Sequence, residues 1–241
     1  MSGRIMGFDV HEIAAACELA MRRMDAVAGN VANVGTPGFK QEYLVLIDEL
    51  KGKGNPARRE ETARLELQID FRPGIVKQTG NPFDIALSGE GFFTVQTADG
   101  TAYTRKGDFT LDKDGFLITQ TGDKVLGEGG PLQINGQVVN VEGDGSVVVD
   151  GVSLGKLNIV TFNNLQGMKR GAGGYYRTEE KAVRMDDPVV RQAHIELSNV
   201  NVIKEMVNMI DIQRTVESYQ KLMQTISDED RQATSRVGKL V

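Results

Sequence analysis

The sequence has one cysteine, no tryptophan and no long apolar run. A single cysteine, Cys17, cannot form an internal disulfide, and it cannot supply a zinc site of the sulfur-rich kind. No apolar run approaches the ~20 residues that span a bilayer, and residues 1–16 lack the apolar core of a secretory signal. We therefore expect no disulfide framework, no membrane insertion and no cleaved signal peptide.

Basic residues are outnumbered by acidic ones. The chain has 28 Lys and Arg against 33 Asp and Glu, which gives a net charge of −5 and an isoelectric point near 5.2. General nucleic-acid binders carry a basic patch, so the balance argues against a nucleic-acid partner. At 241 residues, the chain is long enough for one sizeable domain or two small ones.

Glycine and proline are both absent from Val189 to Val237, although the chain holds 28 and 6 of them. This absence, with apolar residues at spacings of three, four and seven, predicts a long helix over about 189–228. A similar pattern predicts a helix over 9–33. Each helix carries a narrow apolar seam of the kind that packs in coiled coils and needs a partner for burial. The seam residues are Ile13, Cys17, Ala20, Met24, Val27 and Val31, then Ile195, Val202, Met209, Ile212, Val216, Tyr219, Met223 and Ile226.

The middle of the chain changes to a period of two. Leu65, Leu67, Ile69 and Phe71 alternate with polar residues, and dipeptides such as Asn135-Gly136 are frequent beyond them. Short alternating runs between tight turns predict strands. The expected fold is mixed α and β, with an all-β central domain, a short-stranded sandwich or barrel, inserted between long terminal coiled-coil helices. The expected division is 1–40 helix and turn, 41–64 linker, 65–187 outer β domain and 188–241 helix.

Candidate catalytic or metal-binding residues are few. His11 and His194 stand alone in or beside the predicted helices, where a histidine is usually a packing or surface residue. The run from Asp112 to Gly115 opens like a calcium loop, but its glycine comes two residues early, so a hairpin turn is favoured. No glycine-rich stretch completes a nucleotide-binding motif. We expect no catalytic residue, no metal site, no cofactor and no enzymatic activity.

Three stretches resemble the bacterial flagellar basal-body rod and hook axial proteins. Residues 30–40 (NVANVGTPGFK) are similar to the signature that ends their N-terminal helix. Residues 83–93 (FDIALSGEGFF) and 103–109 (YTRKGDF) look like their central motif. Residues 197–201 (LSNVN) and 205–214 (EMVNMIDIQR) are similar to their C-terminal helix. The resemblance spans nearly the whole chain and is closest to the proximal-rod members, with the distal-rod members as the alternative.

This resemblance implies a structural subunit of the rod that drives flagellar motility. Such proteins leave the cell through the flagellar type III export apparatus without a cleaved signal, and self-assemble with other rod subunits in the periplasm. Their terminal helices form an inner coiled-coil layer, with the β domain outside. The resemblance assigns Asn33, Thr36, Pro37, Gly38 and Phe39 to the turn from helix to domain, and we expect Phe39 to face neighbouring helices.

Two other classes of function compete with a rod subunit. The chain could be a soluble β-domain binding module whose helices form a dimeric coiled coil. It could also be an enzyme that uses paired carboxylates, such as a glycan hydrolase, but nothing in the strand pattern selects such a pair. Two seamed helices that bracket a glycine-rich middle favour an assembly protein over both.

Overall fold

The computed structural model describes residues 10–51 and 60–237, which form two compact units. The helical unit holds residues up to Ala32, 42–68 and 201 onward; the β unit holds 33–41 and 69–200. The helices are α1 (Val10–Ala32) and α2 (Val202–Val237). The strands are β1 (Glu42–Lys51), β2 (Glu60–Ile69), β3 (Val76–Gln78), β4 (Ile85–Leu87), β5 (Phe92–Thr97), β6 (Gly100–Thr104), β7 (Thr110–Leu111), β8 (Leu117–Ile118), β9 (Lys124–Gly127), β10 (Gly130–Pro131), β11 (Val139–Val141), β12 (Ser146–Val149), β13 (Val152–Lys156), β14 (Ile159–Thr161), β15 (Lys169–Arg170), β16 (Tyr176–Arg177), β17 (Val183–Arg184), β18 (Val190–Gln192) and β19 (His194–Glu196).

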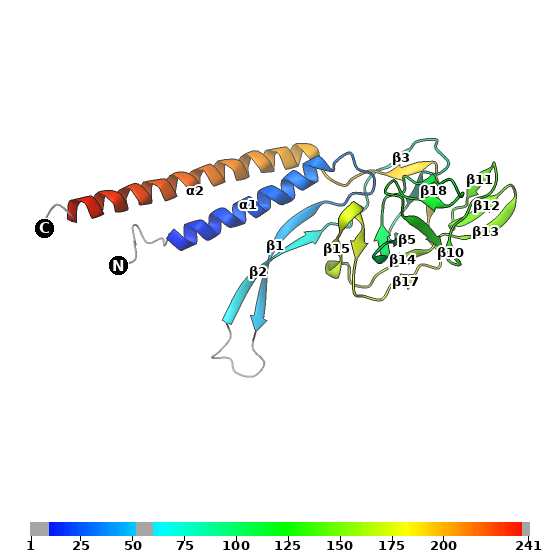
Figure 1. The fold of residues 1–241 in the computed structure, drawn as a ribbon, viewed down its shortest axis with the longest axis horizontal. Coiled ribbons are helices and arrows are strands. Elements are labelled where there is room, and N and C mark those ends of the chain that lie inside the picture. The colour runs from blue at the N-terminus through cyan, green and yellow to red at the C-terminus, as the bar shows by residue number, and fades with distance from the viewer. Residues whose placement is uncertain (1–9, 52–59, 238–241) are drawn as a thin grey trace. The chain divides into compact units, whose positions relative to one another are not determined.

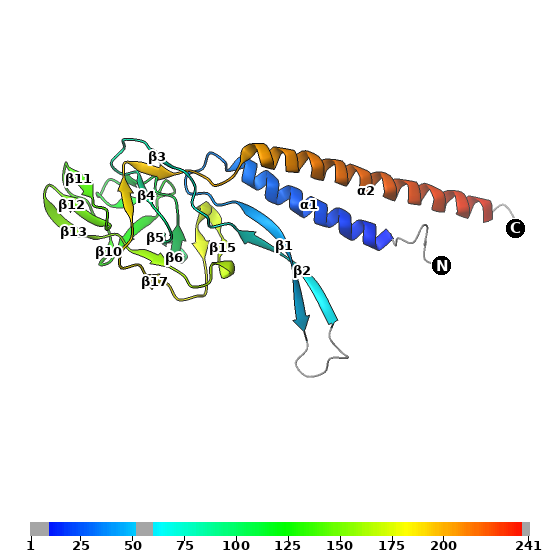
Figure 2. The ribbon, with the colours of Figure 1, turned by 180° about the vertical axis from the view of Figure 1, so that it is seen from behind.

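The two helices lie side by side and run antiparallel, as Figures 1 and 2 both show. The helix α1 has 23 residues and ends before the glycines and proline of the turn motif. The start of α2 is set by Asn201, whose side-chain oxygen accepts the Lys204 N–H at 3.1 Å. An Asn in this role satisfies one of the free N–H groups of the first turn. A mixed α and β fold with a helix near each end and a β-rich middle is confirmed.

The predicted start of the C-terminal helix, at residue 189, is wrong. Residues 190–192 and 194–196 form β18 and β19, which pair antiparallel with β4 and β3. The two strands are separated by Ala193, whose φ of 58° is incompatible with a continuous right-handed helix. Backbone pairing with distant strands therefore overrides the local helical pattern, and Ile195 lies on β19 rather than on a helical seam.

The segment expected to be a linker, 41–64, contains regular structure. The strands β1 and β2 form a two-stranded sheet (Figure 1). Tyr43 on β1 donates a hydrogen bond to Gln68 on β2 at 3.5 Å. The predicted loop over residues 51–59 lies largely outside the described residues. The sequence of β2 alternates from Leu65 to Ile69, as in a strand with one face covered, whereas β1 carries a continuous apolar run from Tyr43 to Ile47.

The β unit is built around a ten-stranded sheet with the central order β15-β16-β6-β5-β9-β8-β7. A small antiparallel sheet, β11-β12-β13, packs part of its side chains into the same core. Two apolar clusters fill the unit. The larger one includes Phe93 and Phe109, whose rings meet edge to face at 5.1 Å. The smaller one is centred on Phe92 and Tyr176, 5.8 Å apart.

The limits of the β unit differ from the expected 65–187. Its core includes Val190 on β18, and its N-terminal boundary includes the turn motif. Both chain segments that border the unit, 33–41 and 197–200, are bonded within it. The N–H of Gln41 donates to the side chain of Asn199 at 2.8 Å, and that side chain donates to Asp70 O at 2.8 Å.

Candidate assembly sites

The seam residues predicted on α1 line the buried side of that helix. Ile13, Cys17, Ala20 and Val27 are buried, and Met24 and Val31 are half-buried. Those predicted on α2 are half-buried, whereas its other described side chains are exposed, apart from Glu205 and Asn208. The half-buried set is Val202, Met209, Ile212, Val216, Tyr219, Met223 and Ile226. Since α1 and α2 lie side by side, we conclude that each seam covers the other within one chain.

The seam of α2 matches α1 in length. It runs from Val202 to Ile226, while α1 runs from Val10 to Ala32. Beyond Ile226 the sequence of α2 turns polar, beginning with Ser227 and Asp228. The apolar side of α2 is therefore about as long as α1, the helix that covers it. The buried thiol of Cys17 is part of this packing.

A buried polar pair joins the two helices to β1. Asn30 and Glu205 are 1 % and 2 % exposed. The Asn30 amide donates to Glu205 Oε2 at 3.2 Å and to Glu42 O at 2.7 Å, and its oxygen accepts the Glu42 N–H at 2.8 Å. A buried polar contact beside an apolar seam disfavours every other register, because a slip leaves its groups unpaired. This pair therefore fixes how α1, α2 and β1 align.

A second buried polar cluster lies in the β unit and centres on Glu196. Lys40, on the turn motif, is 0 % exposed, and its Nζ donates to Glu196 Oε1 at 2.6 Å and to Arg72 O at 2.9 Å. The Gly74 N–H donates to the same carboxylate oxygen at 2.8 Å. Arg105 Nε lies 3.5 Å from the other oxygen of Glu196. Residues of the N-terminal and central motifs thus meet a carboxylate directly before the C-terminal one.

Burial governs the electrostatics of this cluster. Removal from water lowers the pKa of Lys40 and of Arg105, because it disfavours the charged form, while the nearby Glu196 carboxylate opposes the shift in both. Asp70, nearer the surface, has its pKa lowered by hydrogen bonds from Arg72. A buried charge must be paired and hydrogen-bonded to be tolerated, and the Lys40–Glu196 contact meets both conditions.

The turn motif is held tightly within the β unit. Gly38 has φ of +65°, its N–H donates to Glu196 O at 2.7 Å, and an added Cβ would lie 2.4 Å from the Arg105 carbonyl. Thr36 donates to Asn33 Oδ1 at 3.3 Å, and Pro37 follows it in the turn. Phe39 is buried under the Arg170 guanidinium, whose carbon lies 3.9 Å from the ring centre. The expectation that Phe39 faces neighbouring helices is therefore wrong, since Arg170 covers it.

The other candidates from the sequence do not form a reactive site. His11 is exposed, and His194 Nδ1 lies 2.7 Å from Gln192 O. Asp112 accepts N–H groups from Asp114 and Phe116 at 2.9 and 2.8 Å, as a tight turn requires. Within the described residues, no group of three or more His, Cys, Asp or Glu could hold a metal ion. Nor is either helix there long and apolar enough to cross a membrane.

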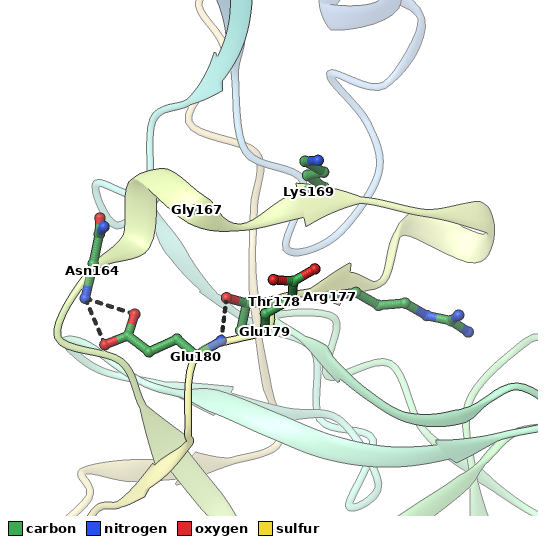
Figure 3. Close-up of a pocket in the computed structure, with 7 residues that line it drawn as sticks. All are labelled: Asn164, Gly167, Lys169, Arg177, Thr178, Glu179 and Glu180. Carbon is green, nitrogen blue, oxygen red and sulfur yellow. Dashed lines mark hydrogen bonds between the residues drawn. The ribbon is translucent and has the colours of Figure 1, made fainter. Parts of the chain in front are cut away.

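An open polar pocket lies beside β15 and β16 (Figure 3). Glu180 accepts the Asn164 N–H at 3.0 and 3.2 Å, and its own N–H donates to Thr178 at 3.1 Å. Arg177, also at the pocket, reaches Asp99 at 3.1 Å. The full lining is Asn164, Gly167, Lys169, Arg177, Thr178, Glu179 and Glu180. The Glu180 carboxylate is thus held by the backbone of Asn164, and the Arg177 guanidinium pairs with Asp99, so neither group is directed at a ligand.

The sequence did not predict the four residues at the centre of the two buried polar clusters, namely Asn30, Lys40, Glu196 and Glu205. Polar side chains such as these are normally exposed. A signal did exist for three of them, because Asn30, Lys40 and Glu205 lie inside the motif stretches, and Glu196 directly precedes one. What the sequence could not show is that they pair with one another.

Paired terminal helices, a separate β unit and polar clusters directed inward define a structural protein of the assembly type. Comparison with known proteins agrees. The family model "Flagellar hook protein FlgE/F/G D1 domain" matches residues 86–150, and "Flagellar basal body rod FlgEFG protein C-terminal" matches residues 191–236.

Whole-length relatives extend this match. The rod protein FlgF of Caulobacter vibrioides is 33% identical over 91% of this chain and 93% of its own length. FlgG of Buchnera aphidicola from Acyrthosiphon pisum is 35% identical over 89% and 93%, and FlgF of Escherichia coli is 30% identical over 92% and 95%. The chain therefore belongs to the flagellar basal-body rod proteins, a family of structural rod subunits.

Proposed function

We propose that this chain is a proximal-rod subunit of FlgF type, which polymerises in the periplasm through its terminal helices. In this proposal the helices form the inner coiled-coil layer of a torque-transmitting tube, and the β unit lies outside. The observation that carries it is the Asn30–Glu205 pair, which joins the last turn of α1, the first turn of α2 and β1 in one helical module. Partners are neighbouring rod subunits, and secretion uses the flagellar type III apparatus without a cleaved signal.

A distal-rod role of FlgG type is the second candidate, because FlgG relatives match over most of the chain. A binding module dimerised by a coiled coil is not favoured, since α1 and α2 can cover their seams within one chain. The rod roles differ in order of assembly. A proximal subunit is incorporated before the distal rod grows, whereas a distal subunit is not.

The test is mass spectrometry of purified basal bodies from the source organism. We expect the chain in complete basal bodies and also in truncated ones from a strain that lacks its distal-rod protein. Presence only in complete basal bodies would assign a distal position. Absence from both, with normal motility after deletion of the gene, would exclude a rod subunit.

A further inference from the structure

The chain passes between its two units four times, after residues 32, 41, 68 and 200. Three residues of the β unit lie within two positions of the last three crossings. They are Gln41, Asp70 and Asn199, and we call them the boundary triad. We call the stretches of the β unit that contain them the first (33–41), second (69–74) and third (196–200) border segments.

The members of the boundary triad are hydrogen-bonded to one another in a ring. The Gln41 N–H donates to Asn199 Oδ1, the Asn199 amide donates to Asp70 O, and the Asp70 N–H donates to Gln41 O, each at 2.8 Å. Asn199 Nδ2 also donates to Arg72 O at 3.1 Å. One half-buried side chain therefore ties together three backbone segments that are far apart in the sequence.

The cluster around Glu196 joins the same three border segments a second time. Lys40, of the first segment, donates through Nζ to Glu196 Oε1 at 2.6 Å and to Arg72 O, of the second segment, at 2.9 Å. The Gly74 N–H, also of the second segment, donates to Glu196 Oε1 at 2.8 Å. Lys40 and Glu196 are shielded from water, so separating the segments breaks bonds between buried groups, which is costly.

The strands next to the third border segment are short. The strand β19 pairs with β3 over three residues, and β18 pairs with β4 over three. A pull on the chain from α2 reaches Val200 first and then these pairs in turn. Strands this short can open locally at much less cost than unfolding of the whole unit, unless other bonds hold them.

We propose that the boundary triad and the Glu196 cluster together form a mechanical clamp. A pull on any one border segment is shared with the other two, because the bonds that join the three segments must break together. The inference rests on the proposed function, in which torque passes between the inner helical layer and the outer β layer of a rod. Asn199 has the central place in the clamp, because its side chain binds both of the other segments.

Magnetic tweezers on the full chain test the clamp by measuring how long the β unit survives at constant force. In the first geometry the pull passes through the third border segment, between handles at Lys204→Cys and Gly129→Cys. Lys204 is exposed on α2, and an added Cβ at Gly129 meets nothing within 4 Å. The native Cys17 is buried and takes no handle. Asn199→Ala should shorten the lifetime at least about tenfold, since it removes three hydrogen bonds and forced unfolding follows the unfolding rate.

A second geometry separates a mechanical role from a general loss of stability. Handles at Gly129→Cys and Glu179→Cys, both exposed in the β unit, pull on the unit without passing through a border segment. Here Asn199→Ala should shorten the lifetime far less than in the first geometry. An equal shortening in both geometries would overturn the proposal, because Asn199 would then stabilise the unit without directing force.

Two further variants complete the comparison in the first geometry. Asn199→Asp keeps the acceptor for Gln41 but loses both donated bonds, so its lifetime should fall between those of wild type and Asn199→Ala. If Asn199→Ala does not fold, this variant of equal size serves in both geometries. The matched control is Asn164→Ala, which removes a side-chain bond to the Gln166 N–H elsewhere in the β unit. A lifetime for Asn199→Ala no shorter than that of this control would also overturn the proposal.

The clamp and the proposed function can fail separately. Absence of the wild-type chain from basal bodies would refute the rod function, whatever the lifetimes under force. Equal lifetimes for the wild type and the Asn199 variants would refute the clamp and leave the rod function standing.

Discussion

Lys40 Nζ lies 2.6 Å from Glu196 Oε1, although 156 residues separate the two in the sequence. The contact joins the end of the turn motif to the last residue of β19, and both side chains are shielded from water. Because these groups bind one another in the interior, removing one leaves an uncompensated buried charge. Such a pair specifies a single arrangement of the segments that carry it.

Glu196→Gln should therefore lower the free energy of unfolding by about 3–5 kcal/mol, because Lys40 stays buried without its counter-charge. Urea denaturation followed by tyrosine fluorescence of the β unit measures the loss. The matched control is Asp99→Asn, which removes the exposed pair with Arg177 and should cost about 0–1 kcal/mol. Equal losses for the two variants would show that the buried pair has no special role.

Asn30→Ala should destabilise the helical unit by about 1–3 kcal/mol, because Glu205 and the backbone of Glu42 lose buried hydrogen-bond partners. Thermal melting at the helical circular dichroism band measures it. Gln213→Ala, at an exposed position of α2, should stay within about 0.5 kcal/mol of wild type. A melting curve for Asn30→Ala that superimposes on this control would contradict the role of Asn30 in register.

Gly38→Ala should cost more than about 1 kcal/mol, since alanine is strained at positive φ and its Cβ would collide with the Arg105 backbone. Gly129→Ala is the comparison, because an added Cβ there meets nothing within 4 Å. Differential scanning calorimetry of both variants gives the two shifts in melting temperature. The account of the turn fails if Gly38→Ala melts at or above the temperature of Gly129→Ala.

Acid sensitivity should depend in part on Asp144. Hydrogen bonds from Lys156 and Ser146 hold the pKa of Asp144 at about 2, below its ordinary value. The folded-state pKa is depressed, so the stabilisation is present above about pH 4 and is lost as pH falls toward 2. Asp144→Asn should narrow the difference between urea midpoints at pH 5 and pH 2. The effect is small because the pair is exposed. Lys156→Gln should act in the same direction. If neither variant changes the dependence of the urea midpoint on pH, the Asp144–Lys156 pair does not contribute to acid sensitivity.

A fragment of residues 33–200 should unfold cooperatively, because it retains the turn motif, β18 and β19. The fragment 65–187, the β domain expected from the sequence pattern, lacks Lys40, Val190 and Glu196 and should show no sharp transition. Calorimetry of the two fragments decides between the boundaries. A cooperative transition for 65–187 would restore the shorter β domain.

Sequence patterns correctly predicted the helices and strands whose buried side is decided by residues close together in the sequence. The spacing of Met209, Ile212 and Val216 identified the covered side of α2, and alternation after Leu65 identified the β-rich middle. The same patterns failed where distant pairing decides. Ile195 falls on the heptad by coincidence, while hydrogen bonds to β3 hold it in a strand. Ala193 adopts a left-handed conformation that no residue preference would suggest.

The polar clusters could not be predicted for a related reason. A lysine or glutamate is exposed by default, and its burial depends on a partner that sequence spacing does not reveal. Lys40 and Glu196 lie at opposite ends of the β unit's sequence. The composition and periodicity of a short stretch of sequence therefore cannot show that these two residues pair. The motif stretches identified the region of Lys40 but assigned its neighbour Phe39 to the wrong surroundings.

The strands β18 and β19 come late in the sequence, and this limits when the β unit can fold if the chain emerges N-terminus first. Their partners β4 and β3 come from the first half of the sequence, and Glu196 is the counter-charge for Lys40. A polypeptide that leaves a narrow channel N-terminus first exposes β3, β4 and Lys40 long before residue 196 follows. Closing such a long loop is slow and cannot occur earlier. On any route that releases the chain N-terminus first, the β unit therefore cannot be completed until residue 196 has emerged.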